Sequence, residues 1–234
     1  MPITDHIMPI CRPMLITGHS RAGTAYMSAL ARYYGMDMRH EALGKSGVSS
    51  WMMAPPAWRV PFHRGWANRG RLWYRFDRVI EVVREPLAHI ASVAFAENHG
   101  SKDRRTGLYW RAQWTPIDMN ANTVRQAVQS IVGWHEMIRV WLTGAVIMHM
   151  ERARFDMAKM LGRDPVDGPG IVNARKHRPV TWKDVRECCD RPTWDALMEY
   201  CHDVGYETTA RLSDVAASER KPADGCDNRR REPG

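Results

Sequence analysis

A loop between a short apolar run and a segment of helical spacing has residue types that suit a bound anion. It reads Gly18, His19, Ser20, Arg21, Ala22, Gly23 and Thr24, and Ala25 follows at the start of the helical segment. The free N–H groups and the dipole of a helix N-terminus favour an anion there. Gly18 and Gly23 permit a positive φ, and Arg21 offers a positive fork. We predict a phosphate-binding loop over residues 18–25, with an ordinary glycine turn as the open alternative.

The loop does not match the Walker A motif of nucleoside triphosphatases. That motif places Lys directly before the Ser or Thr that binds Mg²⁺. Here Gly23 precedes Thr24, and Arg21 lies three residues before Thr24. The sequence therefore disfavours hydrolysis of a nucleoside triphosphate, and a P-loop kinase of a small molecule is kept as an alternative function.

A second motif follows the next strand-like run of the chain. Arg84 comes directly after Val82 and Val83, Pro86 stands at a helix start, and Ser92 lies eight residues after Arg84. Open α/β sheets bind ligands at the carboxyl ends of their strands. We predict that Arg84 and Ser92 hold a second phosphate, whereas a surface ion pair of Arg84 with Glu81 or Glu85 is the alternative.

The elements that must position these motifs alternate between strand and helix. We expect strands at 14–17, 78–83 and 145–148, and helices at 25–34, from Pro86, and at 124–141, 154–161, 181–185 and 192–204. This alternation indicates a central parallel sheet flanked by helices on both faces. We predict a single α/β domain over residues 14–210, between an N-terminal extension (1–13) and a polar, disordered tail (211–234).

The composition is that of a globular protein with excess positive charge. The 234 residues are 44% hydrophobic and 26% charged, and the formal net charge is +8. No run approaches the ~18 apolar residues of a membrane span, and the first residues lack the apolar region of a secretory signal. The five cysteines match no zinc or disulfide spacing, so we expect reduced thiols in a cytoplasmic protein.

The positive charge is concentrated in one segment, 42–76, which has six Lys and Arg, no acidic residue and four of the ten Trp. Its prolines and glycines forbid one continuous helix. Arginine with tryptophan in an irregular segment is typical of a surface that binds anions or ring-shaped groups. A solvated loop whose Trp side chains fill the core is the alternative.

The two phosphate motifs resemble those of the P-loop-like sulfotransferases, which use 3′-phosphoadenosine 5′-phosphosulfate (PAPS). In that family a loop similar to residues 18–25 binds the 5′-phosphosulfate, and an Arg, Pro and Ser spaced like Arg84, Pro86 and Ser92 hold the 3′-phosphate. The resemblance spans about residues 14–206. Ala22 and Ala25 stand where the family commonly has hydroxyl residues, so Ser20 or backbone N–H groups are expected to replace them. Arg175, within 173–177, is the nearest candidate for the family's later basic signature.

Sulfuryl transfer needs in-line positioning, neutralised charge on the leaving group and a base for the acceptor. The resemblance implies Glu41 as this base, because carbohydrate sulfotransferases have a Glu at the end of the strand after the loop helix. His40 is the second candidate, and an ion pair of Glu41 with Arg39 or Lys45 is the structural alternative. Arg21 is expected to stabilise charge on the leaving oxygen. The scheme requires no metal.

The segment that follows the base candidates is the expected acceptor site. Its candidate contacts are Lys45, Trp51, Trp58, Arg59 and His63, with Trp110 from later in the chain. Cationic and aromatic side chains suit a glycan, a glycolipid or a small-molecule hydroxyl or amine acceptor. A single-stranded RNA-binding module would also use such residues. We disfavour nucleic acid because that function leaves both phosphate motifs unexplained.

Overall fold

The computed structural model of the chain describes residues 9–58, 70–97, 102–170 and 177–206. The tail assigned to 211–234 lies outside these residues. The strands are β1 (Ile10–Gly18), β2 (Met38–His40), β3 (Gly47–Ser49), β4 (Tyr74–Val83) and β5 (Val146–His149). The α-helices are α1 (Thr24–Tyr33), α2 (Pro86–Ala96), α3 (Lys102–Arg111), α4 (Thr123–Trp141), α5 (Ala153–Leu161), α6 (Trp182–Cys188) and α7 (Arg191–Asp203). Short 3₁₀ helices are η1 (Trp51–Met53), η2 (Arg71–Trp73) and η3 (Met150–Arg152).

The strands form one parallel five-stranded sheet in the order β2-β3-β1-β4-β5, which confirms the predicted α/β fold. The strands expected at 14–17, 78–83 and 145–148 are present as β1, β4 and β5. β1 is longer than predicted, because residues 10–13, assigned to the N-terminal extension, pair with the start of β4. β2 and β3 were not predicted, since three residues each are too few to show a periodicity.

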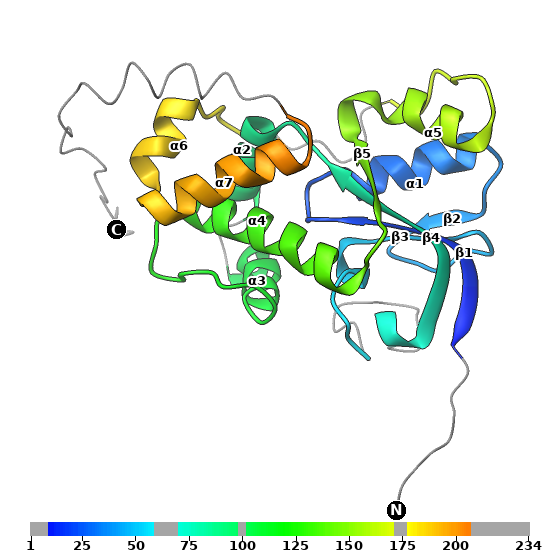
Figure 1. Cartoon of the computed structure of the whole chain (residues 1–234), viewed down its shortest axis with the longest axis horizontal. Helices are drawn as coiled ribbons and strands as arrows, with labels where there is room; N and C mark the ends of the chain where they lie inside the picture. The colour runs from blue at the N-terminus through cyan, green and yellow to red at the C-terminus, as the bar shows by residue number, and fades with distance from the viewer. Residues whose placement is uncertain (1–8, 59–69, 98–101, 171–176, 207–234) are drawn as a thin grey trace, which may run out of the picture.

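Helices cover both faces of the sheet (Figure 1). On one face α1 and α5 bury a core that includes Met14, Ile16, Met27 and Met157. On the other face α4 packs against the sheet through Trp134 and other apolar side chains. α2, α6 and α7 join α4 in a further apolar cluster beyond the sheet edge (Figure 1). The two-sided coverage explains why the central strands have continuous apolar runs.

Side-chain caps define the starts of several helices but not that of α1. Asn122 accepts from Arg125 N at α4, Thr181 and Asp184 form a capping box at α6, and Asp190 caps α7. Gly23 stands at the N-cap of α1 and provides no side-chain hydrogen bond. The first N–H groups of an α-helix have no partner within the helix. The α1 terminus therefore offers donors to another group.

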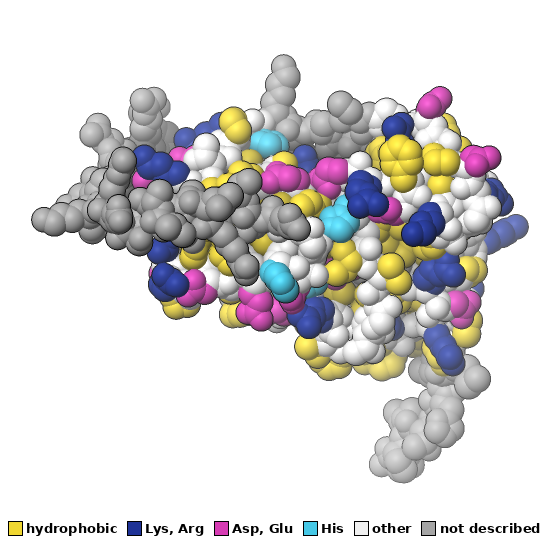
Figure 2. Space-filling view, turned by 45° about the horizontal axis from the view of Figure 1, so that its top comes forward, with side chains coloured by type: hydrophobic (Ala, Val, Ile, Leu, Met, Phe, Trp, Pro, Cys, Tyr) yellow, Lys and Arg dark blue, Asp and Glu magenta, His cyan; other side chains and the backbone are white. Residues whose placement is uncertain are grey.

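The surface of the described residues carries scattered positive charge. Figure 2 shows Lys and Arg side chains over the half of the molecule that contains α1 and α5, with hydrophobic side chains between them. Exposed cations of this half include Arg152, Arg154 and Lys159. Within the described ranges no helix is both long and apolar enough to cross a membrane.

A buried acid and a histidine join β4 to α4. Glu81 Oε1 lies 2.8 Å from His135 Nδ1, and the two residues are each 4% exposed. The Tyr200 ring of α7 packs edge-on against His135. Burial raises the pKa of Glu81, and His135 opposes this shift. This contact ties the sheet to the helical layer at a position where an unpartnered carboxyl group would be costly.

We predict that His135→Ala lowers the free energy of unfolding by about 3 kcal/mol, because it leaves the buried Glu81 carboxyl group without its partner. Urea denaturation at pH 7 measures the change. Glu136→Ala, at the exposed neighbouring position on α4, is the control and should change stability by no more than about 0.5 kcal/mol. A His135→Ala cost below about 1 kcal/mol would contradict the role given to the pair.

Candidate functional site

The predicted phosphate loop lies at the carboxyl end of β1, the central strand of the sheet. Gly18 adopts φ 152°, and a Cβ atom at this position would meet Val82 O at 2.4 Å. Gly23 adopts φ 118° at the N-cap of α1, and a Cβ atom there would meet the Met150 sulfur at 2.4 Å. The close approach to the β4 backbone therefore requires glycine at position 18, and the positive φ favours glycine at position 23, where the flexible Met150 side chain is the neighbour.

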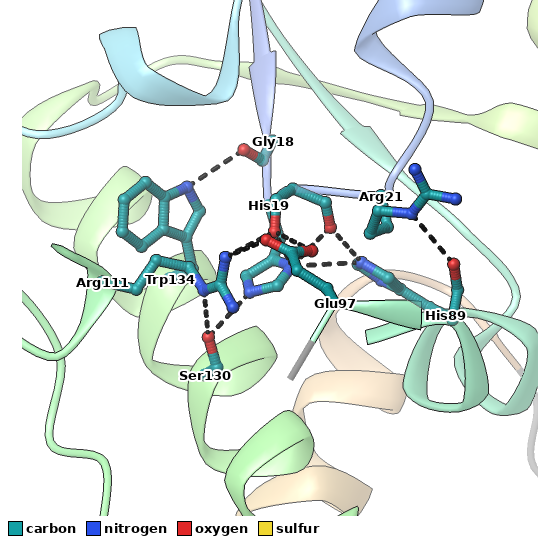
Figure 3. Close-up of polar contacts among 10 residues, drawn as sticks. Gly18, His19, Arg21, His89, Glu97, Arg111, Ser130 and Trp134 are labelled. Atoms are coloured by element: carbon teal, nitrogen blue, oxygen red, sulfur yellow. Dashed lines mark hydrogen bonds and ion pairs between the residues drawn. The ribbon is translucent and has the colours of Figure 1, made fainter. Parts of the chain in front are cut away.

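The two sequence motifs assigned to phosphates are in direct contact. Arg21 Nε donates to Ser92 Oγ at 3.1 Å, and Arg84 Nη1 donates to the Arg21 carbonyl at 3.3 Å (Figure 3 draws the first bond). Ser92 is 1% exposed, so its hydroxyl lies beneath the Arg21 side chain. Residues separated by more than 60 positions thus place two guanidinium groups at the open α1 terminus. This arrangement can bind a ligand that carries several negative charges.

The Ser20 hydroxyl faces the interior instead of the open side of the loop. It donates to Glu97 Oε2 at 2.9 Å and accepts from Arg111 Nη1 at 2.8 Å. Both partners of Ser20 also form an ion pair with each other, and the Arg111 side chain is fully buried. Ala22 is buried as well. The Ser20 hydroxyl is therefore already engaged, and backbone N–H groups are the donors that remain in place of the missing hydroxyl residues.

Two buried histidines lie beneath the loop (Figure 3). His19 Nδ1 and His89 Nε2 lie 2.6 and 3.0 Å from the same oxygen, the Ser20 carbonyl. His19 Nε2 lies 2.8 Å from Ser130 Oγ, and Trp134 Nε1 donates to the Gly18 carbonyl. Burial, assisted by the charge of Arg111, holds the pKa of His19 well below its usual value. Both imidazoles are consequently neutral at pH 7.

The two base candidates meet the loop at the end of β2. His40 Nε2 lies 3.3 Å from Thr24 Oγ1 and 3.8 Å from Glu41 Oε1. Their side chains are 34% and 33% exposed, so both are accessible from solvent. Burial lowers the pKa of His40, which favours its neutral form. The structure therefore brings His40 and Glu41 beside the residue that opens α1.

Arg21 and Glu41 share an uncommon backbone conformation. They adopt φ 67° and 50°, and in the described part of the chain they are the two non-glycine residues with positive φ. Such a conformation costs about 1 kcal/mol or more for a residue with a Cβ atom. Backbone strain at two of the three residues that the sequence nominated for chemistry is typical of a functional site.

The expected acceptor residues do not gather in one place. Trp51 is half-buried and packs on Trp110, and Trp110 is only 4% exposed within the core. Trp110 is therefore a packing residue in this conformation and does not present its ring to an acceptor. Lys45 is exposed on the segment between β2 and β3.

Trp58 lies near the amino ends of the strands, whereas the loop lies at their carboxyl ends. Its ring is 55% exposed and packs edge-on against Trp73, which directly precedes β4. β4 is ten residues long, so its two ends are separated by about 30 Å. Trp58 is thus remote from the base candidates. Arg59, His63 and Arg175 lie outside the described residues.

Four residues of the site were missed by the sequence analysis: His89, Glu97, Arg111 and Ser130. One signal existed for His89, which precedes Ser92 by three residues and so shares its face of the helix that begins at Pro86. The other three act through tertiary contacts that no local pattern records. Among the described residues no group of three or more His, Cys, Asp and Glu could hold a metal ion.

Comparison of the chain with models of protein families, with curated proteins and with solved structures finds no match.

We predict that Glu41→Gly leaves the free energy of unfolding unchanged within about 0.5 kcal/mol, because relief of the positive φ offsets the entropy that glycine gains in the unfolded chain. Arg39→Gly is the control, two residues earlier in β2, where the backbone is extended and glycine should cost about 1 kcal/mol. Chemical denaturation of both variants measures the difference. Equal losses in the two variants would show that Glu41 is not strained.

Acid should destabilise the fold through His89. Burial, with the charges of Arg84 and Arg111, lowers the pKa of His89 from 6.5 to about 4. In the unfolded chain His89 is protonated below about pH 6.5, whereas in the folded chain it stays neutral down to about pH 4. The free energy of unfolding therefore falls as the pH drops through this window.

At pH 5 the lowered pKa of His89 reduces the free energy of unfolding by about 2 kcal/mol. His89→Gln removes the titration and keeps an N–H donor for the Ser20 carbonyl. We expect this variant to lose about 2 kcal/mol less stability than the wild type between pH 7 and pH 5. Denaturation curves at both pH values measure this, and parallel losses would contradict a neutral, buried His89.

Proposed function

We propose that this protein is a PAPS-dependent sulfotransferase whose acceptor is a hydroxyl or amine of a glycan, a glycolipid or a small molecule. The observation that carries the proposal is the junction of Arg21, Ser92 and Arg84 at the carboxyl ends of β1 and β4. The sequence resemblance assigns these residues to two different phosphate groups of one donor. Their proximity would allow one ligand to reach both motifs.

The donor would be held by groups that complement its charge. The N–H groups of the first turn of α1, the Arg21 guanidinium and the Thr24 hydroxyl suit the 5′-phosphosulfate. Arg84 suits the 3′-phosphate, to which the sequence resemblance also assigns Ser92. Ser92 Oγ also accepts from Arg21 Nε, so it orients the guanidinium that would neutralise the leaving group. The N-cap residue of α1 is Gly23, which has no carboxylate to compete with the negative charge of the donor.

The reaction would then proceed as an in-line displacement at sulfur. Glu41 accepts the proton of the acceptor hydroxyl, and the acceptor oxygen forms a bond to sulfur. The bond between sulfur and the 5′-phosphate oxygen breaks, and its electron pair leaves with adenosine 3′,5′-bisphosphate. Arg21 neutralises the charge that develops on that oxygen. His40 Nε2 lies 3.8 Å from Glu41 Oε1 and is the second candidate for the base.

The donor assignment is tested by ligand binding without Mg²⁺. We expect adenosine 3′,5′-bisphosphate to raise the melting temperature of the wild type more than ATP does. Arg84→Ala should weaken its binding about tenfold, because a charged hydrogen bond is lost. Arg78→Ala, an exposed arginine on the same strand, is the matched control and should bind as the wild type does. An equal response to ATP and adenosine 3′,5′-bisphosphate would reject the assignment.

The base assignment is tested separately with labelled PAPS and a panel of glycans and phenols. Glu41→Gln should bind adenosine 3′,5′-bisphosphate normally, while its turnover falls at least about a hundredfold because the general base is lost. His40→Gln should retain more activity than Glu41→Gln. Full activity of Glu41→Gln would show that another group accepts the proton.

A further inference from the structure

Two histidines on the buried side of the loop fix the orientation of the peptide unit between Ser20 and Arg21. Its carbonyl oxygen lies 2.6 Å from His19 Nδ1 and 3.0 Å from His89 Nε2, on the buried side of the loop. In a planar trans peptide the carbonyl and the following N–H point in opposite directions. A carbonyl held toward the interior therefore turns the Arg21 N–H toward the open side. The left-handed conformation of Arg21 continues this orientation into the turn that leads to α1.

The proton on His19 is fixed by a chain of donors that begins at Arg111. A guanidinium group only donates, so Ser130 Oγ accepts from Arg111 Nε at 2.8 Å. The Ser130 hydroxyl proton is then directed to His19 Nε2, which lies 2.8 Å away. His19 consequently carries its own proton on Nδ1, the atom that faces the Ser20 carbonyl. Figure 3 shows this chain running from Arg111 through Ser130 to the loop.

Arg111 also contacts the side chain of Ser20. Its Nη1 atom donates to Ser20 Oγ and to Glu97 Oε1, and Glu97 accepts in turn from the Ser20 hydroxyl. Arg111 is fully buried and Ser130 is 0% exposed, so this side-chain network is well shielded from water. A network of this kind permits few alternative arrangements, because each lost partner leaves a buried polar group unsatisfied.

We propose that Ser130 of α4 and Arg111 of α3 are positioning residues that set the affinity of the loop for a 5′-phosphate group without touching it. Ser130 directs the His19 proton, His19 holds the Ser20 carbonyl inward, and the Arg21 N–H is thereby presented to the anion. Arg84 belongs to a different strand and reaches the loop at the Arg21 carbonyl. The inference rests on the proposed function for the identity of the ligand only.

The position of a phosphate on the ribose makes this inference testable. Adenosine 5′-monophosphate probes the loop, whereas adenosine 3′-monophosphate probes Arg84. Ser130→Ala should weaken binding of the 5′-monophosphate about tenfold and leave binding of the 3′-monophosphate within about twofold, as measured by calorimetry or NMR titration. A general loss of packing would weaken both nucleotides together, so the split distinguishes positioning from stability.

Ser28→Ala is the matched control. Ser28 is a fully buried serine on α1 whose hydroxyl donates to the Met38 carbonyl, outside the Arg111 network. It should lower the melting temperature as Ser130→Ala does and leave both affinities unchanged. Arg111→Lys is a second variant, because one ammonium group cannot donate to Ser130 and Ser20 in the geometry of the guanidinium fork. It should show the same selective loss.

Equal weakening of both nucleotides in Ser130→Ala, or no weakening of either, would overturn the inference. A wild type that binds neither monophosphate overturns it together with the donor assignment. A wild type that binds both nucleotides and transfers no sulfuryl group contradicts the proposed reaction alone, and the comparison of variants then still decides the inference.

Discussion

The hydrogen bonds that hold the Ser20 carbonyl beneath the loop are the interaction on which the rest of the site depends. Buried polar groups are stable only when they are paired, and here Arg111 and Glu97 are paired both with each other and with Ser20. The partners come from α2, α3 and α4, so the loop is shaped correctly only when all three helices are packed against the sheet. The apolar clusters around α4 therefore serve the site as well as the fold.

One residue of β3 connects the start of α1 to Glu41, one of the two strained residues of the site. Ser49 Oγ donates to the Thr24 carbonyl at 2.6 Å, and its own carbonyl accepts from Glu41 N at 3.0 Å. Thr24 belongs to the loop and Glu41 follows β2, so Ser49 links the loop to the base candidate. The short strand β3 thereby stabilises a backbone conformation at Glu41 that the isolated segment would not adopt.

The sequence allowed prediction of features that have a local signal. The loop follows from its glycine positions, the long amphipathic helix from its periodicity, and the place of Arg84 from the strand-like run before it, and the structure contains the loop, the helix and the strand. The direction of the Ser20 hydroxyl, the burial of Trp110 and the remote position of Trp58 were not predictable, because they depend on which end and which face of the sheet each segment reaches. Arg111 and Glu97 gave no local signal, since their role arises from contact between segments far apart in the chain.

The central claim is that one nucleotide joins both phosphate motifs, and a crystal structure of the protein with adenosine 3′,5′-bisphosphate tests it most directly. The account predicts the 5′-phosphate at hydrogen-bonding distance from the Arg21 N–H and the first turn of α1, with the 3′-phosphate against Arg84. The Ser20 carbonyl should remain beneath the loop between His19 and His89. A nucleotide bound with neither phosphate at the loop, or with the two phosphates exchanged, would contradict the account.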